Sequence, residues 1–149
     1  MHAEEALPAL VHAIDRLDWE GVRERLADTV DVDYSELSGE RQGPMPGDDL
    51  VAQWQGMLPG FVSTQHLLGP AVITPEGDAT RIDTHVRAWH QLPDTAWMVA
   101  GHYEALIYAD GRIAALTLRV FHIDGPGDAA DRAMARVAAG DVRAPVSGR

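Results

Sequence analysis

The spacing of apolar residues changes from helical to strand-like at Gly60, and this change limits the folds open to the chain. Three stretches before Gly60 have the three- and four-residue spacing of amphipathic helices, at 4–17, about 19–28 and about 49–58. Four stretches after it read as strands, near 62–74, 79–92, 97–109 and 112–123. Three helices followed by a four-strand antiparallel meander predict an α+β domain with its helices on one sheet face.

Shorter signals fill the gaps between these segments. Asp110-Gly111 and Glu76-Gly77-Asp78 are typical of hairpin turns. Residues 31–34 read as a short strand and residues 39–47 as a loop. Residues 127–140 predict a last helix with Ala130, Met134 and Val137 on one side, and the final nine residues are expected to be frayed.

Composition narrows the class of protein. The chain has 149 residues, of which 46% are apolar and 23% charged, and this predicts one soluble domain over 1–149 with 125–149 as a C-terminal helix and tail. A net charge of −11 without a Lys/Arg cluster argues against nucleic-acid binding. The sequence offers neither an apolar run of ~18–20 residues nor a targeting segment, so we expect a cytoplasmic protein without a membrane partner. It has no Cys, which excludes thiolate chemistry and Cys-ligated metals.

Alternation along two strands predicts which side chains face the helices. In the first strand the inward row is Ile82, Thr84, Val86, Ala88 and His90, and in the second it is Gly101, Tyr103, Ala105 and Ile107. His90 is the one strongly polar member of these rows. The outer row of the first strand includes His85 and Trp89, and the aromatic residues on that face predict a homo-oligomer.

Four polar residues are candidates for a proton-transfer site, namely Asp15, Tyr34, His66 and His90. Each has an ordinary structural explanation when taken alone. An inward His is usually a core residue bonded to a backbone carbonyl, Asp15 could pair with a surface Arg, and Tyr34 could be a packing residue. Two imidazoles and a carboxylate around one cavity would instead transfer protons at neutral pH.

Several short motifs occur in one order across about residues 5–123. They are Asp15-x-x-Asp18-Trp19, Val32-Asp33-Tyr34, Met45-Pro46, Thr64-Gln65-His66, Val86-Arg87-Ala88-Trp89-His90-Gln91, Gly101-His102 and Asp110-Gly111. With them the chain resembles scytalone dehydratase and its relatives in the SnoaL-like branch of the NTF2-like superfamily. The resemblance implies a cone-shaped fold in which a curved antiparallel sheet wraps around N-terminal helices and a deep pocket.

The resemblance also implies roles for the four polar residues. His66 matches the family's catalytic acid and base, and Asp15 matches the carboxylate that orients it. His90 matches a second histidine of the pocket, and Tyr34 matches a tyrosine that holds a water against the substrate carbonyl. The sequence departs from the family where Ile14, Ala105 and Ile107 replace a tyrosine, a serine and an asparagine.

These departures predict a substrate more apolar than scytalone. The residues expected to contact it are Ile14, Trp54, Met57, Val86, Ala88, Tyr103, Ala105, Ile107 and Val120. Trp54 and Met57 have helical spacing, so a place in the core is the plainer explanation for them, although a pocket wall uses the same residue types.

The expected function is a dehydratase that eliminates water from a small carbonyl or polyketide-like compound through a His–Asp pair, with no metal or organic cofactor. A polyketide-type cyclase or an isomerase of the same group, a different leaving group such as halide, and a non-catalytic binding module all stay open. The resemblance favours a trimer, with a dimer as the alternative. Whether the last helix closes the pocket is not decided by the sequence.

Overall fold

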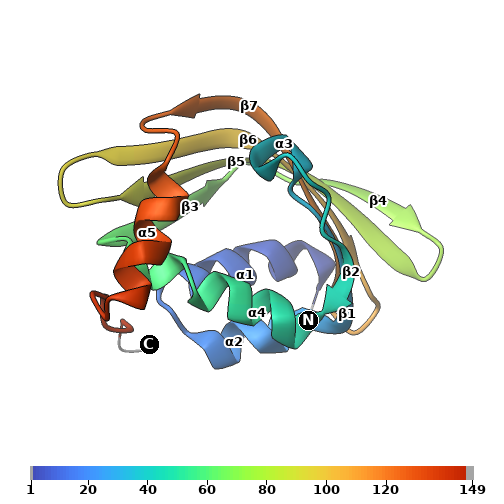
Figure 1. Ribbon diagram of the computed structural model, residues 1–149. Coiled ribbons are helices and arrows are strands. Elements are labelled where there is room, and N and C mark those ends of the chain that lie inside the picture. Colours follow the sequence, from blue (N-terminus) through green and yellow to red (C-terminus); the bar gives the residue numbers. More distant parts are fainter. Residues whose placement is uncertain (1, 147–149) are drawn as a thin grey trace.

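The computed structural model describes residues 2–146 and has a strongly curved, open sheet (Figure 1). In that part of the chain the sheet has seven strands: β1 Leu26–Asp33, β2 Gly43–Pro46, β3 Ser63–Leu68, β4 Val72–Glu76, β5 Ala79–Gln91, β6 Ala96–Ile107 and β7 Ile113–Asp124. Their order is β2-β1-β7-β6-β5-β3, and β4 also pairs with β5. The curved α+β fold predicted from the sequence is confirmed.

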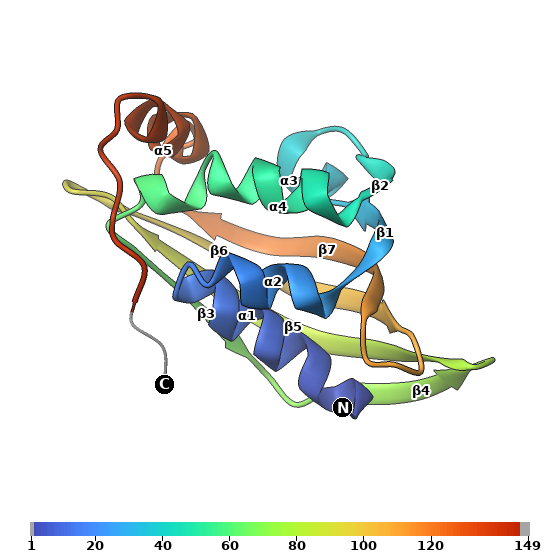
Figure 2. The same cartoon turned by 90° about the horizontal axis from the view of Figure 1, so that it is seen from below.

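The helices lie on the concave side of the sheet (Figure 1). They are the 3-10 turns η1 Ala3–Glu5 and η2 Leu58–Gly60, and the α-helices α1 Ala6–Asp15, α2 Trp19–Arg25, α3 Ser35–Ser38, α4 Gly47–Gln55 and α5 Ala129–Ala138. Figure 2 shows α1 running beneath the sheet, with α2 and α4 alongside and α5 beyond the end of α4. Within residues 2–146, each helix is too short or too polar to cross a membrane.

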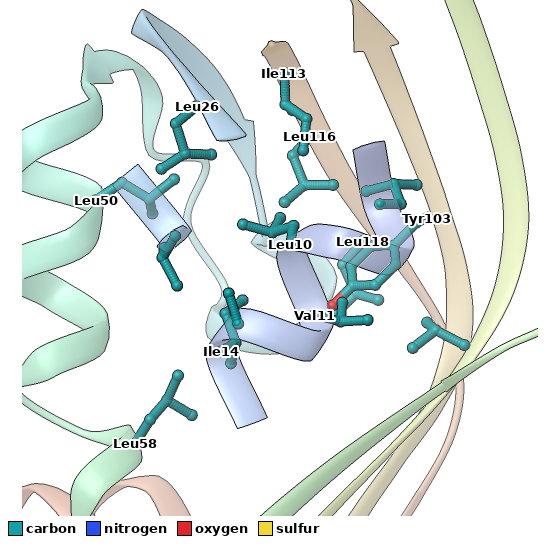
Figure 3. Close-up of a cluster of buried hydrophobic side chains, with 14 of the residues drawn as sticks. Leu10, Val11, Ile14, Leu26, Leu50, Leu58, Tyr103, Ile113, Leu116 and Leu118 are labelled. Atoms are coloured by element: carbon teal, nitrogen blue, oxygen red, sulfur yellow. The ribbon is translucent and has the colours of Figure 1, made fainter. Parts of the chain in front are cut away.

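The core forms because α1 places an apolar stripe against the sheet. Leu10 and Val11 lie toward Leu116 of β7 and Tyr103 of β6, and Ile14 extends toward η2 (Figure 3). Leu10 and Leu116 each keep only 1% of their surface exposed. The stripe ends one residue later, so Asp15 occupies the last position of α1, at the margin of the buried face.

The alternation predicted for β5 and β6 is confirmed by burial. His90 is 5% exposed and Tyr103 also 5%, whereas Trp89 on the outer face is 48% exposed. Phe121 and Tyr108 add to the exposed aromatic residues of the outer face. The homo-oligomer inferred from this face stays a prediction.

Three strand predictions were wrong. The stretch 62–74 is two strands, β3 and β4, which both pair with β5 and are separated by Gly69-Pro70-Ala71, where Pro70 has no N–H to donate. The short strand at 31–34 is the end of β1, which begins at Leu26 and pairs in parallel with β7. The expected loop at 39–47 contains β2, whose prolines are tolerated because β2 is an edge strand.

The C-terminal tail is ordered over its described part, contrary to the expected fraying. The Arg143 backbone N–H donates to the Pro59 carbonyl, and the Val146 N–H donates to the Arg16 carbonyl, both at 3.0 Å. The tail therefore packs against η2 and the end of α1. Residues 147–149 of the expected frayed segment lie outside the described residues.

Removing core volume beneath the sheet should destabilise the fold. Leu10→Ala is expected to lower the free energy of unfolding by about 2–5 kcal/mol, because it leaves a cavity between α1 and β7. Leu67→Ala is the matched control, since Leu67 is 58% exposed, and it should change stability by less than about 0.5 kcal/mol. Urea unfolding with an unchanged m-value would measure both; equal losses for the two variants would contradict the assigned core.

Candidate active site

A cavity of about 580 Å³ opens between the concave sheet face and the helices α3, α4 and α5. Its walls are mostly apolar, and the described residues that line it include no Asp, Glu, Lys or Arg. The polar groups that reach it come from Tyr34, His66, His90 and Tyr103, and from Ser38, Gln42 and Gln53 on α3, the following loop and α4. A cavity of this size and character suits an uncharged small molecule.

Asp15 and His66 contact each other behind the cavity wall. Asp15 Oδ1 lies 2.7 Å from His66 Nδ1, and Asp15 Oδ2 accepts the His66 backbone N–H at 2.8 Å. The Thr64 hydroxyl donates to the same Oδ1 at 3.0 Å. A carboxylate only accepts, so the imidazole proton is assigned to Nδ1. His66 lines the cavity, and this tautomer leaves its Nε2 lone pair free to act as a base.

His90 lies beside His66 in the same wall, with the ring centroids 5.9 Å apart. Its Nδ1 is 3.1 Å from the Trp97 carbonyl oxygen, which can only accept, so the His90 proton is also assigned to Nδ1. Burial lowers the pKa of His90 from 6.5 to about 4, and the neighbouring His66 contributes in the same direction. His90 is therefore neutral at pH 7, and its Nε2 is an acceptor of hydrogen bonds.

Two phenols form a third polar group in the cavity. The side chains of Tyr34, at the start of α3, and Tyr103, from β6, hydrogen-bond to each other. Burial raises the pKa of Tyr103 to about 12, although the bond from Tyr34 partly offsets this rise. Burial also raises the pKa of Tyr34 well above its ordinary value, and Tyr103 raises it further. Both phenols keep their protons at neutral pH and act as donors.

Most of the predicted pocket residues line this cavity. They are Ile14, Tyr34, Trp54, Met57, His66, Val86, Ala88, His90 and Tyr103. Asp15 does not line the cavity itself, but it contacts His66, which does.

Three predicted contacts do not line the cavity. Ala105 and Ile107 pair with Ile82 and Thr80 near the start of β5, where η1 packs and the core is filled. Val120 packs on the core at the edge of β7 beneath α3, and its backbone N–H donates to Glu36 at 2.9 Å. Strand parity identified the correct face for Ala105 and Ile107, but the cavity does not extend that far along the strands.

Several wall residues were not predicted from the sequence. Trp97 and Val99 share the inward parity of Tyr103 in β6, so extending that row would have found them. Ala130 and Met134 of α5 also line the cavity, so the last helix forms part of its wall. Gln42 follows α3 in a stretch read as a loop, and no local pattern indicates that it reaches the site.

Within residues 2–146, no group of three or more His, Cys, Asp or Glu side chains is arranged to hold a metal ion.

Comparison with known proteins identifies the family. The SnoaL-like domain family matches residues 4–114, so the chain belongs to it. No curated protein sequence shows significant similarity.

Solved structures share the fold. A Kribbella flavida protein has a TM-score of 0.76 at 26% identity, covering 87% of this chain and 94% of its own. A Novosphingobium aromaticivorans protein, provisionally named a scytalone dehydratase, has a TM-score of 0.66 at 15% identity, covering 81% and 83%. A hexachlorocyclohexane dehydrochlorinase has a TM-score of 0.62 at 14% identity, covering 81% and 86%.

The buried His90 should make stability depend on pH. Its folded-state pKa of about 4 lies below the ordinary 6.5, so between these values the unfolded chain binds a proton that the folded chain does not. The free energy of unfolding should therefore fall as pH falls through this window, by roughly 3 kcal/mol in all. His90→Gln should lose this part of the dependence, and the exposed His85→Gln should keep it. Urea unfolding between pH 7 and pH 4 would test this, and parallel curves for wild type and His90→Gln would contradict it.

Proposed function

We propose that this member of the SnoaL-like family is a cofactor-independent lyase that eliminates water from a small, largely apolar carbonyl compound. The observation that carries the proposal is the 2.7 Å contact between His66 Nδ1 and Asp15, which leaves Nε2 free in the wall of an apolar cavity. A pocket that only binds ligands has no need of an oriented base. His66 can serve both proton transfers of the elimination, because its neutral ring accepts the proton at Nε2 and the imidazolium formed in that step returns it.

The proposed reaction begins with proton transfer from carbon. His66 Nε2 takes the proton from the carbon next to the carbonyl, and the C–H electron pair forms an enolate. The enolate re-forms the carbonyl, its electrons make a double bond to the β-carbon, and the C–O bond there breaks. His66 then returns its proton to the departing hydroxide, which leaves as water. Asp15 stabilises the imidazolium that exists between these two transfers.

The phenol pair is suited to stabilise the enolate oxygen. In the proposed arrangement Tyr34 donates its proton to the Tyr103 hydroxyl oxygen. The Tyr103 hydroxyl is then free to donate to the substrate carbonyl, and Tyr34 supports it from behind. Tyr103 thereby supplies the second phenol that the family pattern loses at Ile14.

His90 is proposed to act on the leaving group and not on the enolate oxygen. Its Nε2 accepts rather than donates, because the Nδ1 proton is held by the Trp97 carbonyl. It cannot stabilise an enolate oxygen in that tautomer. Its proposed role is to accept a hydrogen bond from the leaving hydroxyl and so to align the C–O bond. A hydroxyl has the proton for this contact and a halide has none, which favours water over halide as the leaving group.

Halide elimination is the second candidate, because a dehydrochlorinase is among the proteins that share the fold. It would use the same base and would not require His90. The two reactions can be separated with a panel of cyclic β-hydroxy ketones and matching β-chloro ketones. Both substrates give the same enone, so the reaction is identified by which of them produces the enone absorbance.

Replacing either member of the Asp15–His66 pair should strongly reduce turnover. His66→Gln and Asp15→Asn are each expected to lower kcat by about 10²–10⁴-fold, because one removes the general base and the other its orientation. His85→Gln is the control, since His85 lies on the exposed outer face. Enone absorbance and deuterium uptake at the α-carbon would measure the loss. Activity retained by His66→Gln, or a panel that binds without turnover or exchange, would contradict the proposed function.

The two phenols, Tyr34 and Tyr103, should contribute unequally to kcat. Tyr103→Phe is expected to lower kcat by about 10²–10³-fold, as for loss of an oxyanion donor, and Tyr34→Phe by less. The exposed Tyr108→Phe is the control and should leave kcat unchanged. The reverse order of Tyr34 and Tyr103 would show that the donor has been misassigned.

A further inference from the structure

The chain after α5 runs back past the ends of the helices (Figure 2), and the Val146 N–H donates to the Arg16 carbonyl just beyond α1. Arg136 of α5 holds the start of this path, because its Nε donates to the Gly60 carbonyl at 2.7 Å and its Nη1 lies 2.9 Å from Asp141. Two residues further on, Arg143 contacts Asp15 and Thr64. The tail has therefore two arginine anchors, and only one of them touches the candidate site.

Arg143 hydrogen-bonds both to Asp15 itself and to Thr64, which is one of the donors to the Asp15 carboxylate. Its Nη1 donates to the backbone carbonyl of Asp15 at 3.0 Å, and its Nη2 donates to the Thr64 hydroxyl oxygen at 3.0 Å. Its Nε is buried without a partner among the described residues. A half-buried guanidinium with an unpaired N–H is a poor choice for fastening a tail alone, because an unmade buried hydrogen bond is costly.

The contact with Thr64 determines where the Thr64 proton points. Arginine only donates, so Nη2 occupies a lone pair of the Thr64 oxygen and the hydroxyl proton must be directed elsewhere. It is directed to Asp15 Oδ1 at 3.0 Å. The result is a directed chain of donors, from Arg143 to Thr64 to the carboxylate that holds His66.

The positive charge of Arg143 also acts on the Asp15–His66 pair. The ionisable groups around His66 include Asp15 from α1, His90 from β5, the phenols of Tyr34 and Tyr103, and Arg143 from the tail. At pH 7 His90 and the phenols are neutral, so Asp15 and Arg143 carry the local charge. A cation behind Asp15 disfavours a second positive charge on the imidazole, and a base must be neutral to accept a proton.

We propose that Arg143 is a positioning residue of the Asp15–His66 pair, which directs the Thr64 proton to Asp15 and keeps His66 in its neutral, proton-accepting form. The benefit of this role to catalysis rests on the proposed function. The effect of Arg143 on the His66 ring does not rest on it, and this effect can be measured without any substrate.

The test is an NMR titration of the His66 ring in protein with ¹⁵N-labelled histidine, assigned by comparison with His66→Gln. Arg143→Met removes the charge and keeps the side-chain stem, and should raise the His66 titration midpoint by roughly 0.5–1.5 pH units. Arg143→Lys keeps the charge and should stay within about 0.3 units of wild type. Arg136→Met loosens the same tail without touching Asp15 or Thr64, and should leave the midpoint unchanged.

An unchanged or lowered midpoint in Arg143→Met would overturn the proposal. An equal shift in Arg136→Met would also overturn it, because the effect would then come from tail packing. If the protein turns over β-hydroxy ketones, the acid limb of its pH–rate profile should move upward in Arg143→Met by the same amount. If it turns over none of them, the titration still decides the role of Arg143 while the proposed function fails.

Discussion

The carboxylate of Asp15 joins the first helix to the sheet, and the candidate site depends on this junction. It accepts from the His66 ring, the His66 backbone N–H and the Thr64 hydroxyl. Three donors from one short strand leave the carboxylate little freedom, because each additional bond fixes another of its lone pairs. The imidazole in turn has one tautomer, and His66 lines the cavity. Helix packing and proton chemistry are thus set by the same atoms.

The environment gives the two neighbouring histidines different properties. Both have Nδ1 bonded to an oxygen, but His66 faces a carboxylate and His90 faces a neutral carbonyl. An anion can stabilise an imidazolium, whereas a buried carbonyl offers much less. One ring can therefore take up a proton during a reaction, while the other stays neutral far below pH 7. This difference between the two rings arises from their positions in the fold and not from residue type.

Local patterns predicted the parts of the structure that local physics determines. The stripe of α1 and the alternation of β5 and β6 follow from burial of one face, and the alternation placed His90 inward. The roles predicted for Asp15 and His66 came from the resemblance to the family. The edge strand β2 was missed because Gly43-Pro44-Met45-Pro46 has no alternation and owes its order to pairing with β1. Ala105 and Ile107 were misplaced because parity tells which face a residue occupies and not how far a cavity reaches. Arg143 lies 128 positions from Asp15, and no short-range signal connects them.

The segment that forms the α5 side of the cavity wall and the segment that reaches Asp15 are one continuous piece of chain. Met134 borders the ligand space and Arg143 touches the carboxylate layer, and both lie beyond the stretch 4–114 shared with the family. The shape of the cavity wall and the contacts behind the Asp15–His66 pair thus depend on the same segment. A change in the position of α5 would therefore also be felt at the contacts that Arg143 makes with Asp15 and Thr64.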